Sequence, residues 1–190
     1  MIFGLFVSLL ALTGGMRLVE LAVSARRMRA RPDAVVAEPA LFPAMAALHT
    51  ALIGLPIAEV VLRDRPAVLP VTAAALAVLA LATALRVWTL HTLGRAWNVR
   101  VLPPESVVTD GPYAWIRHPN YLVVILEIAA LPLVHGAWLS ALALSLANAA
   151  VLAVRIPTEE RALAALPAWR AAMAHKPRFI PRLDRPAPRG

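Results

Sequence analysis

Five apolar runs separated by short polar segments dominate the pattern of the chain. They cover about residues 2–23, 40–62, 69–90, 120–134 and 137–154. Most are about twenty residues long, the length that an α-helix needs to cross a bilayer, and the fourth is shorter. The pattern predicts an all-α integral membrane protein with about five transmembrane helices. The pair His135-Gly136 separates the last two runs, which we expect to form an antiparallel hairpin.

The composition agrees with a membrane protein. Hydrophobic residues make up 60% of the 190-residue chain and charged residues only 16%, whereas soluble domains carry about 25% charged residues. The chain has no cysteine, which excludes disulfides, thiol catalysis and cysteine-ligated metals. Arg17 and Glu20 interrupt the first run, and no basic segment precedes it. We therefore expect that run to remain as a span and not to be a cleaved signal peptide.

A few polar residues lie inside the apolar runs. Arg17 and Glu20 are three apart, on one helical face, and two arrangements are open to them. They form a pair inside the bundle, or an ion pair near the interface with the arginine stem extended toward water. The spacing of His49 and Glu59 does not suit a metal site on one helical face, so His49 is predicted to be a packed polar residue and not a ligand.

The cations are unevenly distributed between the two sides of the predicted membrane. Fifteen of the 19 Lys and Arg residues flank the runs on one side, and only Arg63 and Arg65 lie on the other. Cytoplasmic loops of membrane proteins carry such an excess. The sequence therefore predicts an inner-membrane protein with its N-terminus outside and its C-terminus in the cytoplasm. Topology also accounts for the net charge of +8, so no nucleic-acid partner is expected.

Two polar segments are predicted to meet on the cytoplasmic side. One reads GPYAWIRHPNYL at 111–122 and the other RIPTEER at 155–161, and the predicted hairpin connects them. Arg155 and Glu159 would share one face of an uninterrupted helix. Pro157 leaves a second arrangement open, in which a new helix begins there and Glu159 and Glu160 are first-turn acids favoured by its dipole.

Four motifs in this half of the chain, taken together, resemble the isoprenylcysteine carboxyl methyltransferase family. They are LGRAW at 93–97, VVTDGPYAWIRHPNYL at 107–122, RIPTEERAL at 155–163 and PRFIP at 177–181. The resemblance covers about residues 85–182. It implies a multi-span membrane enzyme that takes a methyl group from S-adenosylmethionine, with a cofactor pocket at the cytoplasmic face. On this reading residues 1–92 form a three-span region and residues 93–190 a methyltransferase-like region, within one structural unit.

The resemblance also implies roles for individual residues. Arg155 would face the methyl acceptor and act in catalysis with Glu159 and His118. Rings can hold the cofactor's sulfonium cation, a carboxylate can accept from its ammonium and hydroxyls, and a guanidinium can orient an anionic acceptor. The residues implied to bind the cofactor are Ser106, Val107, Val108, Tyr113, His118, Pro119, Asn120, Tyr121 and Glu159.

The acceptor is less well defined by the motifs. The family's usual FG-x-x-Y phrase is replaced by LPAW at 166–169, and Pro157 within the Arg–Glu stretch is also unusual. The N-terminal half is more similar to the bacterial branch of the family, so we expect a lipophilic acceptor with a carboxylate or hydroxyl, such as a long-chain phenol. A carboxylate would need no base, whereas a phenol would need one, for which His118 and Glu160 are the candidates.

Two other functions remain open at this stage. Membrane sterol reductases, which bind a nicotinamide cofactor, carry a similar RHPNY motif, but this chain lacks the Lys-Tyr-Gly phrase that usually follows. A non-enzymatic transport or scaffold protein would be expected to line a path across the bilayer with charges. The strongest polar cluster here lies on one side only, which favours the methyltransferase.

Overall fold

A computed structural model describes residues 1–30, 41–99 and 107–181, and these residues form helices and connecting segments without any strand. The all-α prediction is therefore confirmed for the described chain. The helices are α1 (Ile2–Arg29), α2 (Leu41–Leu62), α3 (Leu69–Leu93), α4 (Pro119–Leu133), α5 (Trp138–Leu163) and α6 (Pro167–Met173), with 3₁₀ turns η1 (Gly94–Ala96) and η2 (Gly111–Ala114).

Four of the described helices, α1, α2, α3 and α5, are long and apolar enough to cross a membrane. Helix α4 is equally apolar but has only 15 residues, which is short of the roughly 20 that a span needs. The prediction of five spans is therefore not confirmed: the described chain has four candidate spans and one shorter apolar helix. The proline at the first position of α4 suits a helix start, because its fixed φ fits the helix and its missing N–H is not needed there.

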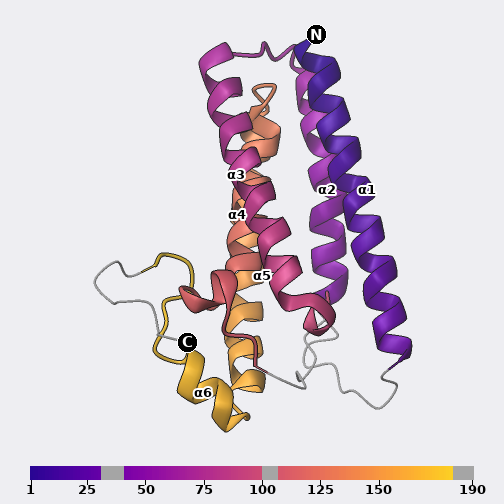
Figure 1. Cartoon of the computed structure of the whole chain (residues 1–190). Helices are drawn as coiled ribbons and strands as arrows, with labels where there is room; N and C mark the ends of the chain where they lie inside the picture. The colour runs from indigo at the N-terminus through magenta and orange to yellow at the C-terminus, as the bar shows by residue number, and fades with distance from the viewer. Residues whose placement is uncertain (31–40, 100–106, 182–190) are drawn as a thin grey trace.

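The five longer helices run in alternating directions along one bundle (Figure 1). Helix α4 packs against α3 and α5, α5 also packs against α2, and α1 lies at the edge of the bundle beside α2. The hairpin predicted from the last two apolar runs is present. It brings the start of α4 and the end of α5 to the same end of the bundle, together with η2 and α6 (Figure 1).

The opposite end of the hairpin is held by a buried carboxylate. Glu59 accepts hydrogen bonds from the backbone N–H groups of Leu139 and Ser140, at 3.2 and 2.7 Å, in the first turn of α5. An anion is stabilised there by the helix dipole. Gly136 has φ of 74°, and a Cβ atom at this position would lie 2.7 Å from the carbonyl oxygen of Pro66. These contacts fix the turn between α4 and α5 against the end of α2.

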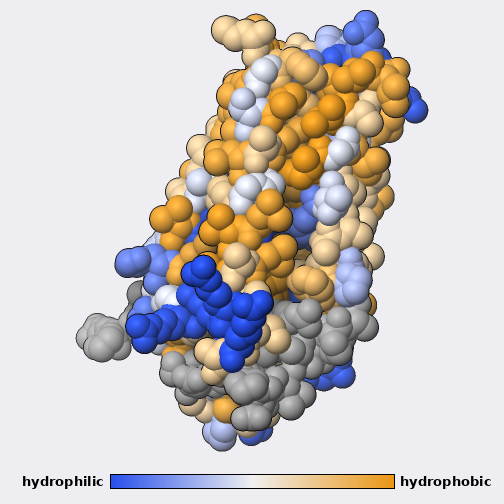
Figure 2. All heavy atoms as spheres, turned by 90° about the vertical axis from the view of Figure 1, so that its right-hand side faces the viewer, coloured by the Kyte–Doolittle hydropathy of each residue, from blue (hydrophilic) through white to orange (hydrophobic). Residues whose placement is uncertain are grey.

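The outer surface of the bundle is apolar along its length, with the strongest polar patch toward one end (Figure 2). Leu18, Leu81 and Leu146 are 68%, 70% and 64% exposed. Soluble proteins rarely expose large continuous apolar surfaces, whereas lipid-facing helices do so by necessity. Packed inside are Phe6, Leu10, Leu52, Ile128, Leu131 and Val134. The structure is that of a multi-pass membrane protein.

Candidate active site

One large cavity connects the polar end of the bundle to its apolar interior. Its volume is about 1310 Å³, which exceeds the usual 300–1,000 Å³ of a small-molecule site. Its polar end is lined by Tyr113, His118, Asn120, Tyr121, Arg155, Glu159 and Trp169, and its apolar part, between α1 and α2, by Gly14, Leu18, Leu48, Ile53 and Gly54. A single bound ligand could therefore contact both a charged region and an apolar region of the cavity.

Three side chains at the polar end form one hydrogen-bonded chain. The Arg155 Nε donates to the hydroxyl of Tyr121 at 2.7 Å, and that hydroxyl donates to the carboxylate of Glu159. Helix α5 continues through Pro157, so Arg155 and Glu159 lie on one helix and both line the cavity. The alternative in which a new helix begins at Pro157 is therefore wrong.

Arg155 is buried, with only 6% of its surface exposed. Its Nη2 donates to the carbonyl oxygen of Val99 at 2.5 Å, and its Nη1 contacts the sulfur of Met45. Its guanidinium carbon lies 5.7 Å from the centre of the Tyr121 ring. Within the part of the chain that the structure describes, no carboxylate forms a direct ion pair with Arg155. A buried cation held by neutral groups next to a cavity is suited to an anionic ligand.

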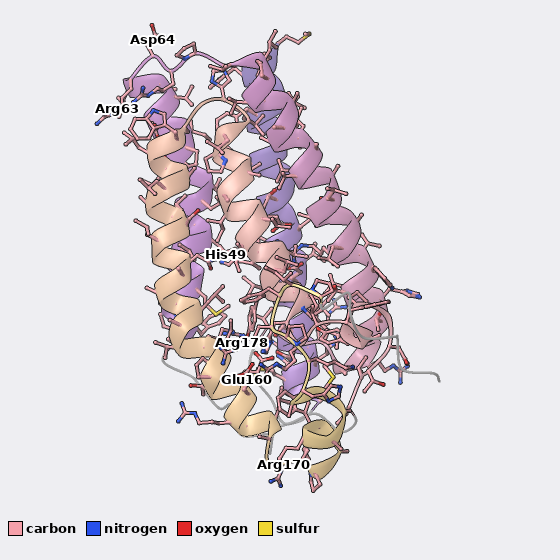
Figure 3. The ribbon with its side chains drawn as sticks, turned by 90° about the vertical axis from the view of Figure 1, so that its left-hand side faces the viewer. His49, Arg63, Asp64, Glu160, Arg170 and Arg178 are labelled. Atoms are coloured by element: carbon pink, nitrogen blue, oxygen red, sulfur yellow. The ribbon has the colours of Figure 1, made fainter. Side chains whose placement is uncertain are left out.

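Glu160 is the centre of a second cluster, which the adjacent Glu159 does not join. Its carboxylate lies 2.9 Å from the Nε2 of His118, 3.2 Å from Arg117 and 2.7 Å from Arg178. Figure 3 shows Glu160 and Arg178 side by side near the lower end of the bundle. Glu160 is therefore engaged by two guanidiniums and by the Nε2 of His118, so its carboxylate is not free to take a proton from an acceptor.

The C-terminal motif at 177–181 docks onto the start of α4. The backbone N–H groups of Arg117 and His118 donate to the carbonyl oxygens of Pro177 and Arg178 at 2.9 and 3.1 Å. The Nζ of Lys176 donates to the carbonyl oxygen of Tyr113 at 2.8 Å. Burial lowers the pKa of Lys176, whereas the hydrogen bond to Glu160 raises the pKa of Arg178. Two motifs that are about sixty residues apart therefore form one unit.

Most of the residues predicted to bind a cofactor line the cavity. Pro119 does not; it is buried at the first position of α4, and Ser106 lies outside the described residues. The Oδ1 of Asn120 is buried and has no partner among the described residues. Burial raises the pKa of Tyr113, so its phenol stays protonated at neutral pH. The residues that line the cavity are Val107, Val108, Tyr113, His118, Asn120, Tyr121 and Glu159, together with Arg155.

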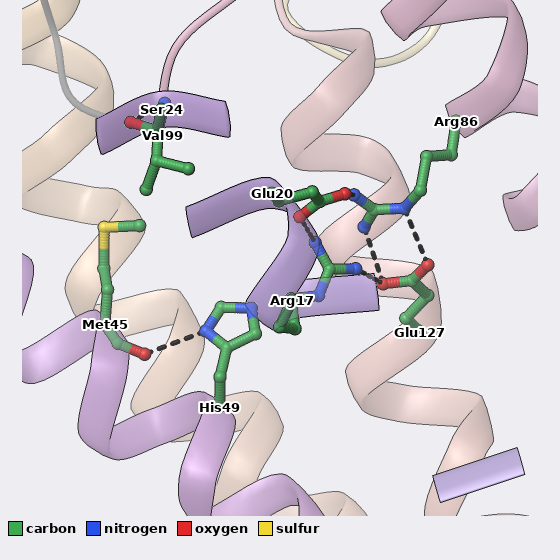
Figure 4. A network of polar contacts seen from close by, with 8 residues as sticks. All are labelled: Arg17, Glu20, Ser24, Met45, His49, Arg86, Val99 and Glu127. Atoms are coloured by element: carbon green, nitrogen blue, oxygen red, sulfur yellow. Dashed lines mark hydrogen bonds and ion pairs between the residues drawn. The ribbon is translucent and has the colours of Figure 1, made fainter. Parts of the chain in front are cut away.

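A buried network of four charges lies beside the cavity, and the sequence pattern predicts only the Arg17–Glu20 half of it. Glu127 on α4 binds Arg86 on α3 through two hydrogen bonds of 3.0 and 2.7 Å, and it accepts a further bond of 2.7 Å from Arg17. Glu20 lies 2.5 Å from Arg17 and 2.8 Å from Arg86 (Figure 4). Arg17 and Glu20 thus pair inside the bundle. Arg86 and Glu127 could have been identified as further members, because each is a charged residue within an apolar run.

The sequence predicts His49 to be a packed polar residue, and its side chain does bond to its own helix. It is only half-buried, and it lines the cavity. Its Nδ1 lies 2.8 Å from the carbonyl oxygen of Met45, one helical turn earlier (Figure 4). A polar side chain that lines a cavity can form hydrogen bonds with a molecule bound there.

Fold and site together define a multi-pass helical membrane protein with a charged pocket at one end of its bundle. Residues 74–165 match the model of the isoprenylcysteine carboxyl methyltransferase (ICMT) family. Over these residues the chain is similar to that family, as the motifs predicted.

Two curated relatives are similar to parts of the chain. The uncharacterized protein YpbQ of Bacillus subtilis (strain 168) is 46% identical over 80 residues, which are 41% of this chain and 48% of that protein. The cobalt-zinc-cadmium resistance protein CzcN of Cupriavidus metallidurans is 36% identical over 103 residues, or 50% of this chain and 46% of that protein. The alignments span about half the length of these relatives.

Proposed function

We propose that this protein is a membrane O-methyltransferase that uses S-adenosylmethionine and acts on the carboxylate or hydroxyl of a lipophilic acceptor. The family match supports a membrane methyltransferase. The observation that carries the finer proposal is the single cavity that joins the Arg155–Tyr121–Glu159 chain to an apolar interior. Such a cavity suits a charged methyl donor at one end and a hydrocarbon tail at the other.

The residues at the polar end fit the cofactor chemically. When bound, S-adenosylmethionine supplies an electrophilic methyl group on a sulfonium cation. The rings of Tyr113 and Tyr121 line the cavity and suit a cation. Glu159 and the unpartnered Oδ1 of Asn120 are acceptors for the cofactor's ammonium, hydroxyl or amino groups.

Arg155 is the group best suited to the reacting end of the acceptor. A planar guanidinium that is buried and always charged can hold a carboxylate or an oxygen anion in a fixed orientation. Methyl transfer is a direct displacement, so holding the acceptor oxygen in line with the methyl group supplies much of the catalysis. The apolar lining at Leu48 and Ile53 would take the tail of the acceptor.

The name of one relative mentions resistance to cobalt, zinc and cadmium. Within residues 1–30, 41–99 and 107–181, no three His, Asp or Glu side chains are grouped so that they could hold a metal ion. We therefore add no metal site to the proposal.

Cofactor binding is the first test of the proposed function. We expect His118→Ala and Glu159→Ala each to weaken the binding of S-adenosylhomocysteine by about 1–3 kcal/mol, the usual cost of losing a hydrogen bond to a charged group. Titration calorimetry in detergent measures this effect, with His91→Ala as the matched control because His91 is exposed on α3. Unchanged affinity in both site variants would contradict the proposed pocket, and binding of NADPH in its place would favour a reductase.

The proposed orientation places the site at the cytoplasmic face. Arg63 and Asp64 lie at one end of the bundle, and Glu160, Arg170 and Arg178 lie toward the other (Figure 3). Because cations concentrate at the second end, the positive-inside rule assigns that end to the cytoplasm. A reporter that is active only outside the cell should be active when inserted at Asp64 and silent when fused after Gly190. The reverse result would overturn the orientation.

A further inference from the structure

His49 presents an unused nitrogen at the cavity. The Met45 carbonyl oxygen can only accept, so the Nδ1 of His49 must carry a hydrogen. In a neutral imidazole the lone pair is then on Nε2. No described residue forms a hydrogen bond with Nε2, and the side chain is among those that line the cavity. An imidazole in this state accepts a proton from a hydroxyl that enters the cavity.

The position of His49 relates it to Arg155. Met45 precedes His49 by one helical turn, a rise of about 6 Å, and its sulfur contacts the Arg155 guanidinium. All three side chains line the same cavity. A proton acceptor and a buried cation therefore flank one stretch of the cavity, which is the pairing that an ionising hydroxyl needs.

The carboxylates at the polar end of the cavity are already engaged, as is the Nε2 of His118. His118 is bonded to Glu160, Glu160 is paired with Arg117 and Arg178, and Glu159 accepts from Tyr121. His49 therefore contributes an imidazole nitrogen, Nε2, that no described residue engages and that faces the cavity.

A network of four charges lies beside His49. In Figure 4 its ring lies between Met45 and the four-charge network. That network contributes Arg17 and Glu20 from α1, Arg86 from α3 and Glu127 from α4, so its formal charge is zero. The Arg155 cation would face the oxygen that has lost the proton.

We propose that His49 is the general base of the reaction, and that the acceptor is a lipophilic molecule with an acidic hydroxyl, such as a long-chain phenol. This inference rests on the proposed methyltransferase function. The hydroxyl proton moves to the His49 Nε2, and an oxygen lone pair forms the new bond to the methyl carbon of the sulfonium co-substrate. The carbon–sulfur bond breaks with its electron pair left on sulfur, which yields the methyl ether and S-adenosylhomocysteine, and His49 later returns its proton to water.

Methyl transfer to two acceptors tests the role of His49. We expect His49→Gln, whose amide can still donate to the Met45 carbonyl, to lower turnover of a long-chain alkylphenol by about 100-fold or more at neutral pH. The loss should shrink at high pH, where the phenol, with a pKa of about 10, ionises without help. His91→Gln, at an exposed position of α3 outside the cavity, is the control and should stay near the original rate. Equal phenol turnover in the original and the Gln variant, or an equal loss with a fatty acid of the same length, would overturn the inference.

A binding measurement without any methyl donor gives an independent readout. An alkyl-substituted nitrophenol absorbs visible light only as the phenolate, so its spectrum reports whether the protein removes its proton. At a pH where the free probe is mostly protonated, the original protein should produce the phenolate band and His49→Gln should not. The same band in both proteins would overturn the role of His49. Failure to bind S-adenosylhomocysteine would instead contradict the proposed function, and calorimetry separates the two results.

Discussion

Replacement of Arg155 by lysine should lower methyl transfer by about 100-fold while leaving the affinity for S-adenosylhomocysteine almost unchanged. Removal of one preorganised donor from a developing anion typically costs about 10²–10³ in rate. Lysine keeps the positive charge but loses the planar fork that reaches the Tyr121 hydroxyl and the Val99 carbonyl together. Turnover with long-chain phenols and fatty acids measures the loss, and calorimetry measures the affinity.

The matched control for this experiment is Arg161→Lys on the same helix. Arg161 is exposed and bonds only to Pro157 and Thr158 among the described residues, so its replacement should leave turnover near the original. If Arg155→Lys retains full activity, Arg155 serves only as a cationic anchor at the end of an apolar helix. The proposed contact with the acceptor would then be lost.

The second large effect concerns the stability of the bundle. Arg86→Met should destabilise the protein by about 3–5 kcal/mol, because it leaves a carboxylate buried without its main partner. Arg86 is 1% exposed and bonds to both Glu127 and Glu20. The midpoint of thermal unfolding in one detergent measures the change, and Arg63→Met in the exposed connection after α2 is the control.

A double variant separates loss of charge balance from loss of packing. When Glu127→Gln accompanies Arg86→Met, the remaining Arg17–Glu20 pair is neutral and no carboxylate is left unpaired. We therefore expect the double variant to be more stable than Arg86→Met alone. If the double variant is equally or less stable, an unpaired buried carboxylate is not the cause of the lower stability of Arg86→Met.

Much of the helical fold could be predicted from apolar runs alone. The run at 40–62 corresponds to Leu41–Leu62, and the run at 120–134 to Pro119–Leu133. The last run, at 137–154, underestimates the length of its helix, because α5 continues through Pro157 to Leu163. Charged residues at the end of a helix look like a loop in a hydropathy pattern, although they continue the same backbone hydrogen bonds. Packing against Tyr121 and Phe179 in the cluster around Ile156 helps to hold this last part of the helix.

The location of the candidate site was also predictable, because antiparallel helices return the chain to the same end of a bundle. Motif order along the chain therefore indicated that the segments at 111–122 and 155–161 would meet. The sequence pattern did not show that Glu159 and Glu160 have different partners. Successive residues of a helix point about 100° apart, and here one carboxylate meets Tyr121 in the cavity whereas the other meets Arg178 and His118.

The sequence by itself determined the class of fold, the approximate helices, the resemblance to a family and the end of the bundle that carries the polar residues. These properties follow from run lengths, charge placement and local motifs. Only the tertiary structure decided that Arg17 reaches Glu127, 110 residues away, and that His49 lies on the cavity near Arg155. Such contacts depend on how each helix is rotated about its axis, and that rotation is set by side chains from helices far apart in the chain. A hydropathy pattern contains no information about those partners.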